Sequence, residues 1–356
     1  MALIVQDAEA LSQAVSIAPA SSERILFALS ESERAQFFPH FRNESLYSVP
    51  CVWEDPSTTN SRDWLQQLKQ VRPTILVSCW VTPRLPAELL FTKALPLRYV
   101  CHAAGSVKSV VPREFISAGG LVTNWGNLVS AQVAEHALLL ILACLKNLPR
   151  WYPAQNQKDH QWGNSAALKT RSLKGKKIGI HGFGNIAREL IRLLQPFEVD
   201  CSVYSQNVPS HLILEKGATP SGSLKDLFLK NEIVVECEAL TPQTRGVITE
   251  ELLGLMRQDA IFVNIARGAI VDEKALAHFA AQGRIRVASD VFQTEPLPDN
   301  SALRNIKNLI VSPHIGGPTE ECHSRCGEFA LSNIDRYLKG HPLEGIVDLA
   351  IYDRST

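Results

Sequence analysis

The chain has 356 residues, of which 45% are hydrophobic and 20% are charged. This is enough apolar material for a substantial core, and the length favours two domains. Its 36 lysines and arginines balance 36 aspartates and glutamates, so no excess positive field exists to hold a polyanion. We therefore expect an ordinary globular protein without a nucleic-acid partner.

The distribution of apolar residues argues against a membrane partner. The longest uninterrupted apolar run, residues 137–145, is far shorter than the roughly 20 residues that span a bilayer. The start, Met1 to Asp7, resembles no secretory signal, and a cytoplasmic location is expected. Eight scattered cysteines without a Cys-x-x-Cys pair indicate reduced, mostly buried thiols. The cluster Cys322 to Cys326 lacks the second ligand pair of a zinc site, so no metal is predicted.

The first part of the chain alternates strand-like and helix-like segments. Apolar runs at residues 24–29, 74–78 and 97–101 predict strands, and the amphipathic stretch 61–71 predicts a helix. Such alternation is typical of a parallel α/β sheet. A long apolar helix is expected from Ser130 to Asn147, with Ser130 as its N-cap.

A polar connector, Trp151 to Arg171, separates this part from a second series of elements. Six short strands are expected there, at residues 178–180, 202–204, 233–237, 261–265, 287–291 and 309–311. Helical segments at residues 185–194, 250–256 and 273–282 separate them. This rhythm is typical of a doubly wound nucleotide-binding domain. A last helix, Thr319 to Lys339, is expected to return to the first domain.

A Gly-rich turn follows the first strand of this series. Gly182 permits a tight turn, Gly184 lets the backbone approach a pyrophosphate, and Ala187 lets the helix lie close to its strand. A Gly-rich connector would look the same in isolation, but the strand before and the helix after favour a dinucleotide site. The acidic residue that usually ends the second strand is replaced by Ser205, and no arginine follows it at once. The choice between NAD and NADP therefore stays open.

Three charged or titratable side chains follow successive strands of the same series. Arg267 suits a substrate carboxylate, because its planar fork binds it bidentately. His314 suits a proton donor, and Glu295 could fix its tautomer and favour its protonated form. Each has an ordinary alternative: a surface charge, a solvated loop residue or a satisfied buried histidine. Their combination at one sheet edge favours a hydride-transfer site for a 2-oxo acid.

The whole chain resembles the D-isomer-specific 2-hydroxyacid dehydrogenase family. Supporting segments include residues 131–136, 240–246 and 267–272, and the resemblance is dense from Leu173 to Gly317. It implies two doubly wound parallel-sheet domains, with a Rossmann NAD(P)-binding domain inserted in a flavodoxin-like substrate domain. The inserted domain would span residues 148–318, and the substrate domain residues 1–147 and 319–356. A homodimer acting on a small 2-oxo or 2-hydroxy acid is also implied.

The resemblance further implies a set of site residues. The catalytic residues would be Arg267, Glu295 and His314. The cofactor-binding residues would be Gly182, Gly184, Asn185, Ile186, Ser205, Gln206, Ala239, Ile265, Ala266, Arg267, Asp290, His314, Gly316 and Gly317. The substrate-binding residues would be Trp80, Gly105, Ser106, Val107 and Arg267.

Two features depart from the family pattern. The substrate loop usually reads Ala-Gly-Val-Gly-x-Asp, but residues 104–109 read Ala-Gly-Ser-Val-Lys-Ser. Val107 is therefore expected to restrict the backbone and narrow the pocket. Trp80 either lines an apolar acyl pocket or packs at a domain edge. The alternatives to a 2-hydroxyacid dehydrogenase are a nucleotide-sensing binding protein, as in corepressors on this fold, and an enzyme acting on a substrate such as phosphite.

Overall fold

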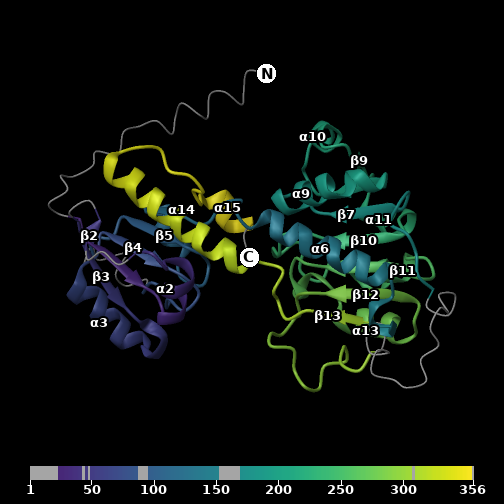
Figure 1. Cartoon of the computed structure of the whole chain (residues 1–356), viewed down its shortest axis with the longest axis horizontal. Helices are drawn as coiled ribbons and strands as arrows, with labels where there is room; N and C mark the ends of the chain where they lie inside the picture. Colours follow the sequence, from purple (N-terminus) through teal and green to yellow (C-terminus); the bar gives the residue numbers. More distant parts are fainter. Residues whose placement is uncertain are drawn as a thin grey trace. The chain divides into compact units, whose positions relative to one another are not determined.

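The computed structural model describes residues 23–41, 45–46, 49–86, 95–151, 169–306 and 309–354. The described residues form two compact units, each with its own sheet (Figure 1). The first unit lies within Met1–Gly126 and Glu320–Tyr352, and the second within Asn127–Thr319 and Asp353–Thr356. The first unit thus joins segments from the two ends of the sequence. Most of the connector expected between residues 151 and 171 lies outside the described residues.

The first unit is built on a sheet with the order β2-β3-β1-β4-β5-β6. Its strands are β1 (Ile25–Ala28), β2 (Ser45–Leu46), β3 (Val49–Glu54), β4 (Ile75–Ser78), β5 (Tyr99–His102) and β6 (Leu121–Thr123). The short β2 runs antiparallel to β3, and the other neighbours pair in parallel. Without β2, the order is that of flavodoxin-like sheets, which confirms the expected fold class for this unit.

The first unit also contains helices. They are α2 (Glu31–Phe37), η2 (Pro56–Thr58), α3 (Ser61–Val71), α5 (Arg113–Ser117), α14 (Glu320–Lys339) and the start of α15 (Leu349–Arg354). Helix α14 packs against α2 and β5, and it lies in the first unit. The approach to α2 is close, because a Cβ at Gly327 would lie 1.6 Å from the carbonyl oxygen of Phe37.

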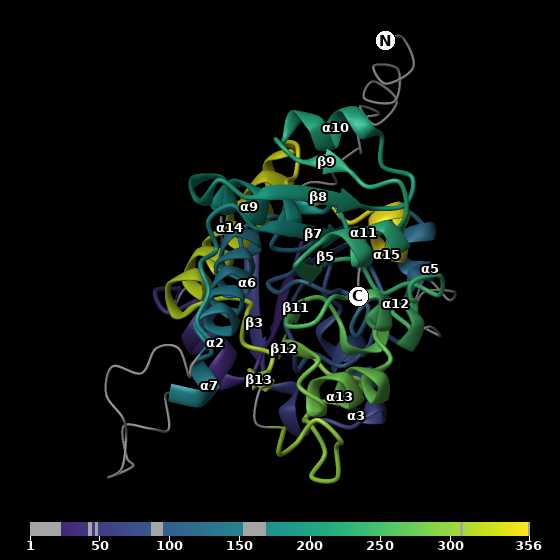
Figure 2. The same ribbon diagram turned by 90° about the vertical axis from the view of Figure 1, so that its right-hand side faces the viewer.

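The second unit is built on a parallel sheet with the order β13-β12-β11-β10-β7-β8-β9 (Figure 2). Its strands are β7 (Lys177–His181), β8 (Asp200–Tyr204), β9 (Thr219–Pro220), β10 (Ile233–Glu236), β11 (Ala260–Asn264), β12 (Ile285–Ser289) and β13 (Leu309–Val311). Counted in chain order, this is the Rossmann order 3-2-1-4-5-6 with one further strand. The six expected strands are confirmed. The two-residue β9 was not expected, because it is too short for a periodic pattern.

The helices of the second unit are α6 (Ser130–Leu145), α7 (Leu148–Trp151), α9 (Asn185–Leu194), η4 (Gln195–Phe197), α10 (Ser210–Glu215), α11 (Leu224–Lys230), α12 (Glu250–Leu255), η5 (Gly268–Ile270) and α13 (Glu273–Ala281). Helix α6 differs from expectation in two ways. Its N-cap is Val129, and no side chain caps it, so the prediction of Ser130 as N-cap is wrong. It also packs on α9, β11 and β12, so contacts place it in the second unit rather than within a first domain ending at residue 147.

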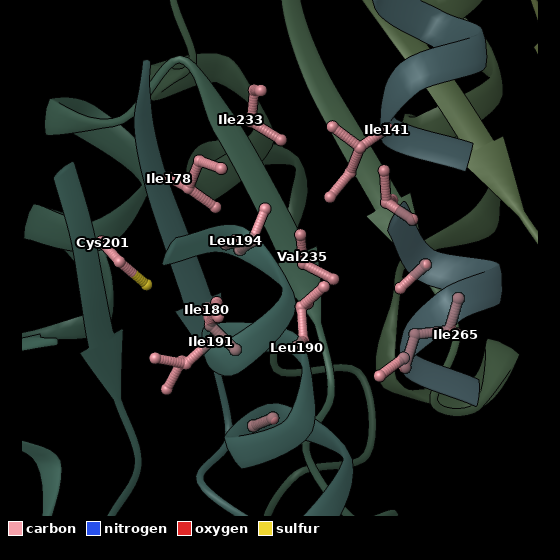
Figure 3. Packing of buried hydrophobic residues seen from close by; sticks show 14 of the residues in the cluster. Ile141, Ile178, Ile180, Leu190, Ile191, Leu194, Cys201, Ile233, Val235 and Ile265 are labelled. Atoms are coloured by element: carbon pink, nitrogen blue, oxygen red, sulfur yellow. The ribbon is translucent and has the colours of Figure 1, made fainter. Parts of the chain in front are cut away.

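The core of the second unit explains this placement of α6. Figure 3 shows Ile141 of this helix facing the cluster that includes Ile178, Leu190, Val235 and Ile265. These side chains come from α6, α9, strands β7 and β10 and the residue after β11, and each is at most 5% exposed. Burial of this apolar surface stabilises the layer of helices on the sheet.

Two further expectations concern the cysteines and membranes. Six of the eight cysteines are buried, and Cys51 and Cys237 are half-buried. Within the described residues, no helix has both the length and the apolar character needed to cross a bilayer.

Candidate active site

The Gly-rich turn joins β7 to α9 at the carboxyl edge of the second sheet. Gly182 has a φ of +99°, and a Cβ there would lie 2.7 Å from the backbone nitrogen of Glu238, so glycine is required. Gly184 is the N-cap of α9, and a Cβ there would meet no atom within 4 Å. Ala187 is fully buried. The open first turn of α9 therefore suits an anionic group such as a pyrophosphate.

A carboxylate pair, Glu236 and Glu238, lies beside this turn at the end of β10. Glu236 is fully buried, and its Oε2 lies 2.6 Å from Nδ1 of the buried His181 on β7. Burial acts to lower the pKa of His181, but the charge of Glu236 and its hydrogen bond outweigh this effect and raise the pKa. The backbone nitrogen of Glu238 donates to Oε1 of Glu236 at 2.8 Å.

The side chain of Glu238 reaches past the end of β7 to the end of β8, the next strand but one in the sheet. Its Oε2 accepts a hydrogen bond from the hydroxyl of Ser205 at 2.9 Å, and its Oε1 accepts one from the nitrogen of Ala239. His181, Glu236 and Glu238 were not predicted from the sequence as members of this region. The available signal was two glutamates at the end of the apolar run of β10.

Arg267 lies in the loop after β11. The side chain of Asn264 accepts from the nitrogen of Ala266 at 3.0 Å and donates to the carbonyl of Arg267 at 3.2 Å, which fixes the turn. The guanidinium of Arg267 donates to the carbonyl of Ala266 at 2.6 Å. Burial lowers the pKa of Arg267, whereas the charge of Glu295 acts in the opposite direction. The loop thus holds a half-buried cation under the influence of a carboxylate.

Gly268 brings this loop against the segment that carries Glu295. A Cβ at Gly268 would lie 1.9 Å from the carbonyl carbon of Phe292 and 2.3 Å from the nitrogen of Gln293. Only glycine permits this approach of two backbones. The packing explains how Arg267 and Glu295, which follow different strands, come to one place.

His314 and Glu295 form a direct pair. Nδ1 of His314 lies 2.6 Å from Oε2 of Glu295, and Oε1 of Glu295 accepts from the nitrogen of Phe292 at 2.9 Å. His314 has a φ of +53°, and its nitrogen donates to the carbonyl of Asp290 at 2.9 Å. Because the carboxylate occupies Nδ1, Nε2 is the ring nitrogen positioned to exchange a proton with another group.

Asp290 organises the loop on which His314 stands. Its Oδ1 accepts from the hydroxyl of Ser312 at 2.6 Å and the nitrogen of Ile315 at 3.0 Å, and its Oδ2 accepts from the nitrogen of Gly316 at 2.8 Å. Burial acts to raise the pKa of Asp290, but hydrogen bonds, led by that of His136, lower it. In the structure this carboxylate is buried and ties the loop to β12.

Apart from Arg267, the residues expected to contact substrate belong to the first unit. Trp80 follows β4, is 49% exposed, and meets the rings of Phe37, Trp125 and His323 edge-on at 5.3, 6.5 and 6.0 Å. Gly105 packs under Trp125, since a Cβ there would lie 2.6 Å from the indole ring. Trp80 is therefore an exposed member of an aromatic cluster.

Val107 does not behave as expected. Its side chain is 1% exposed and packs in the core of the first unit beside Val110 and Val111. The expectation that this side chain narrows a pocket is therefore wrong, because the valine points into the hydrophobic core. Ser106, the preceding residue, is half-buried.

No group of three or more histidine, cysteine, aspartate or glutamate side chains among the described residues is arranged to hold a metal ion. The buried Cys322 and Cys326 lie one helical turn apart in α14, with their sulfurs at 4.0 Å.

The chain is similar in sequence to a known family and to named proteins. Residues 138–316 match the sequence model described as "D-isomer specific 2-hydroxyacid dehydrogenase, NAD binding domain". Glyoxylate reductase of Pyrococcus furiosus is 30% identical over 299 residues, which cover 81% of this chain and 86% of the relative. D-3-phosphoglycerate dehydrogenase of Methanocaldococcus jannaschii is 31% identical over 258 residues. That match covers 72% of this chain and 48% of the relative, so the chain spans about half of its length.

A solved structure supports the fold. The glyoxylate reductase from Paecilomyes thermophila superposes with a TM-score of 0.74 at 23% sequence identity. The superposition covers 92% of this chain and 98% of that one. At this identity the likeness concerns the arrangement of the elements alone.

Proposed function

The chain belongs to the D-isomer specific 2-hydroxyacid dehydrogenase family, and on this premise we propose that it transfers a hydride between a nicotinamide dinucleotide and C2 of a 2-oxo acid. The observation that carries the proposal is the His314–Glu295 pair, at 2.6 Å, beside the half-buried Arg267. A proton donor, its orienting carboxylate and a cation are the groups that this reaction requires. The names of the two relatives support the same reaction class.

Each residue of this set has a separate role in the proposal. When bound, the reduced nicotinamide supplies the hydride that reaches substrate C2. Arg267 binds the substrate carboxylate and polarises the carbonyl, because its fork offers several parallel donors. His314 donates a proton from Nε2 to the carbonyl oxygen as the alkoxide forms. Glu295 holds Nδ1 and thereby fixes the ring and its tautomer.

The dinucleotide would be held at the edge of the second sheet. Gly182 and Gly184 fit this role, since one makes the tight turn and the other leaves the first turn of α9 open. The proposed remaining contacts are Asn185, Ile186, Ser205, Gln206, Ala239, Ile265, Ala266, Asp290, Gly316 and Gly317. The Gly-rich turn suits both NAD and NADP.

The first unit would supply the rest of the substrate contacts. We propose that Gly105, Ser106 and the exposed ring of Trp80 meet the substrate, and that the backbone at Val107 takes part while its side chain stays in the core. The family resemblance also leads us to propose a cytoplasmic homodimer with one substrate domain and one NAD(P)-binding domain in each subunit. A small 2-oxo acid is the proposed partner.

The test follows nicotinamide absorbance with purified protein and NADH or NADPH in separate runs. The acids offered are glyoxylate, hydroxypyruvate, pyruvate and bulkier 2-oxo acids. We expect the wild type to consume NADH or NADPH in the presence of a 2-oxo acid. The Arg267→Ala variant should lose this consumption while its dinucleotide affinity stays nearly unchanged. Loss of dinucleotide binding in this variant would contradict the role assigned to Arg267. Tight dinucleotide binding without turnover of any acid would instead favour the nucleotide-sensing alternative.

A further inference from the structure

The second strand of the Rossmann sheet, β8, ends without the acidic residue that usually binds the adenosine ribose. Ser205 stands at that place. We propose that Glu238, from the end of β10, supplies the missing carboxylate and makes the site select NAD over NADP. The inference rests on the proposed function only in requiring that a dinucleotide occupy the Gly-rich turn.

The position of Glu238 is the first argument. Its backbone nitrogen lies against Gly182, 2.7 Å from where a Cβ would be, and its Oε2 accepts from Ser205 at 2.9 Å. The nitrogen of Gly182 in turn donates to the carbonyl of Tyr204, the last residue of β8, at 2.8 Å. In a Rossmann domain the adenosine ribose lies between the Gly-rich turn and the end of this strand. Glu238 contacts both.

The capacity of the carboxylate is the second argument. Each oxygen of Glu238 accepts one hydrogen bond, from Ser205 or from the nitrogen of Ala239. An ionised carboxylate offers about four acceptor sites, so acceptor capacity remains for ribose hydroxyls. The side chain is half-buried, which leaves part of it open to a ligand.

The local charge is the third argument. Glu236 has a histidine partner, His181, at 2.6 Å. Among the ion pairs formed by the described residues, none involves Glu238. Its negative charge would therefore repel the 2′-phosphate of NADP, whereas the hydroxyl of NAD can donate to it.

The anchoring of Glu238 is the fourth argument. Its nitrogen donates to Oε1 of the buried Glu236 at 2.8 Å, and Glu236 is held by His181. A buried carboxylate with a buried partner cannot swing away without leaving a charge unpaired. The backbone that carries Glu238 is thus fixed beside the turn, and the selecting charge is fixed with it.

The test measures binding by calorimetry and needs no turnover. NAD, NADP, adenosine 5′-monophosphate and adenosine 2′,5′-bisphosphate are titrated into the wild-type protein and into Glu238→Gln and Ser205→Ala. The wild type is expected to bind NAD at least about tenfold more tightly than NADP. Glu238→Gln keeps the size and an acceptor but removes the charge, so this preference should fall at least about tenfold. Ser205→Ala keeps the carboxylate and should keep the preference. Adenosine 5′-monophosphate should likewise bind more tightly than adenosine 2′,5′-bisphosphate to the wild type and to Ser205→Ala, and this difference should shrink in Glu238→Gln.

Two results would overturn the inference: equal wild-type affinity for NAD and NADP, or an unchanged preference in a folded Glu238→Gln protein. The wild-type comparison decides even if that variant does not fold. Selective NAD binding without turnover of any 2-oxo acid would support this inference and refute the proposed function. Equal turnover of a 2-oxo acid with NADH and NADPH, at equal affinity for both, would support the proposed function and refute this inference.

Discussion

Replacing Glu295 by glutamine tests how far His314 depends on its carboxylate partner. In the structure Glu295 accepts two hydrogen bonds, one from Nδ1 of His314 at 2.6 Å and one from the nitrogen of Phe292 at 2.9 Å. The two donors bond to different oxygens of Glu295, and an amide replaces one of these oxygens by an NH₂ donor, so it cannot accept from both donors at their present positions. The variant therefore loses either the histidine contact or the backbone contact that positions it, and it loses the charge in both cases.

The size of the effect follows from the exposure of the pair. A hydrogen bond to a charged group contributes about 1.5–3 kcal/mol. The side chains of His314 and Glu295 are 45% and 34% exposed, so solvent screening favours the lower end of this range. A loss of about 1.5 kcal/mol in the transition state lowers kcat roughly tenfold. Removing the proton donor itself, in His314→Gln, should cost about 10²- to 10⁴-fold.

The assay compares kcat for reduction of the best 2-oxo acid, at saturating cofactor and neutral pH, with the dissociation constant of the dinucleotide. Both variants should bind the dinucleotide nearly as the wild type does. Glu273→Gln is the matched control. Glu273 also accepts a hydrogen bond from a backbone nitrogen of this segment, that of Gln293 at 2.9 Å, but this contact involves no histidine. This variant should keep kcat within about twofold. The positioning role of Glu295 is refuted if kcat of Glu295→Gln is as low as that of His314→Gln, or as high as that of the control.

Two further predictions concern the Gly-rich turn and the buried His102. Gly182→Ala places a Cβ at a φ of +99° and 2.7 Å from a backbone nitrogen, so it should lower the free energy of unfolding by about 1–3 kcal/mol and abolish dinucleotide binding. In Gly184→Ala the added Cβ meets no atom within 4 Å, so the free energy of unfolding in urea should stay within about 0.5 kcal/mol of the wild-type value while dinucleotide binding weakens. Equal effects of the two substitutions on stability would contradict the assigned turn. Burial lowers the pKa of His102 from 6.5 to about 4, so the unfolded chain binds the proton more readily, and stability should fall by about 3 kcal/mol as the pH drops from 6.5 to 4. His102→Gln, which keeps a polar group for Ser78, should flatten this part of the profile of unfolding free energy against pH, and an unchanged slope would refute the assignment.

The sequence predicted those elements whose pattern is set by the element itself. The bounds of α9 follow from its amphipathic spacing, in which Leu190, Ile191 and Leu194 face the core after an open glycine N-cap. The central strands β10 and β11 are nearly continuous apolar runs because helices cover both faces of the sheet. Alternation of these two patterns was sufficient to predict a doubly wound fold.

The sequence could not say which surface covers an apolar residue. Helix α6 is apolar on most of its circumference, so its periodicity does not indicate the sheet on which it packs. The structure places it on α9, β11 and β12. Val107 raised the same difficulty, since a valine in a loop predicts a local restriction but not the direction of its side chain. Its burial beside Val110 and Val111 depends on contacts that a linear pattern does not contain.

The carboxylates at the end of β10 were partly predictable from the sequence. A glutamate within an apolar strand must find a partner when it is buried, because an unpaired buried charge is costly. The partner of Glu236, His181, is 55 residues away in sequence, but parallel pairing of β7 with β10 sets them opposite each other. The same His181 is opposite Tyr204 on β8, so the end of β10 is level with the end of β8, with β7 between them. The Rossmann strand order, once predicted, therefore contained the pairing that carries Glu238 to the ribose side of the turn. What the order alone did not contain was the direction of the Glu238 side chain, and the bond to Ser205 supplies it.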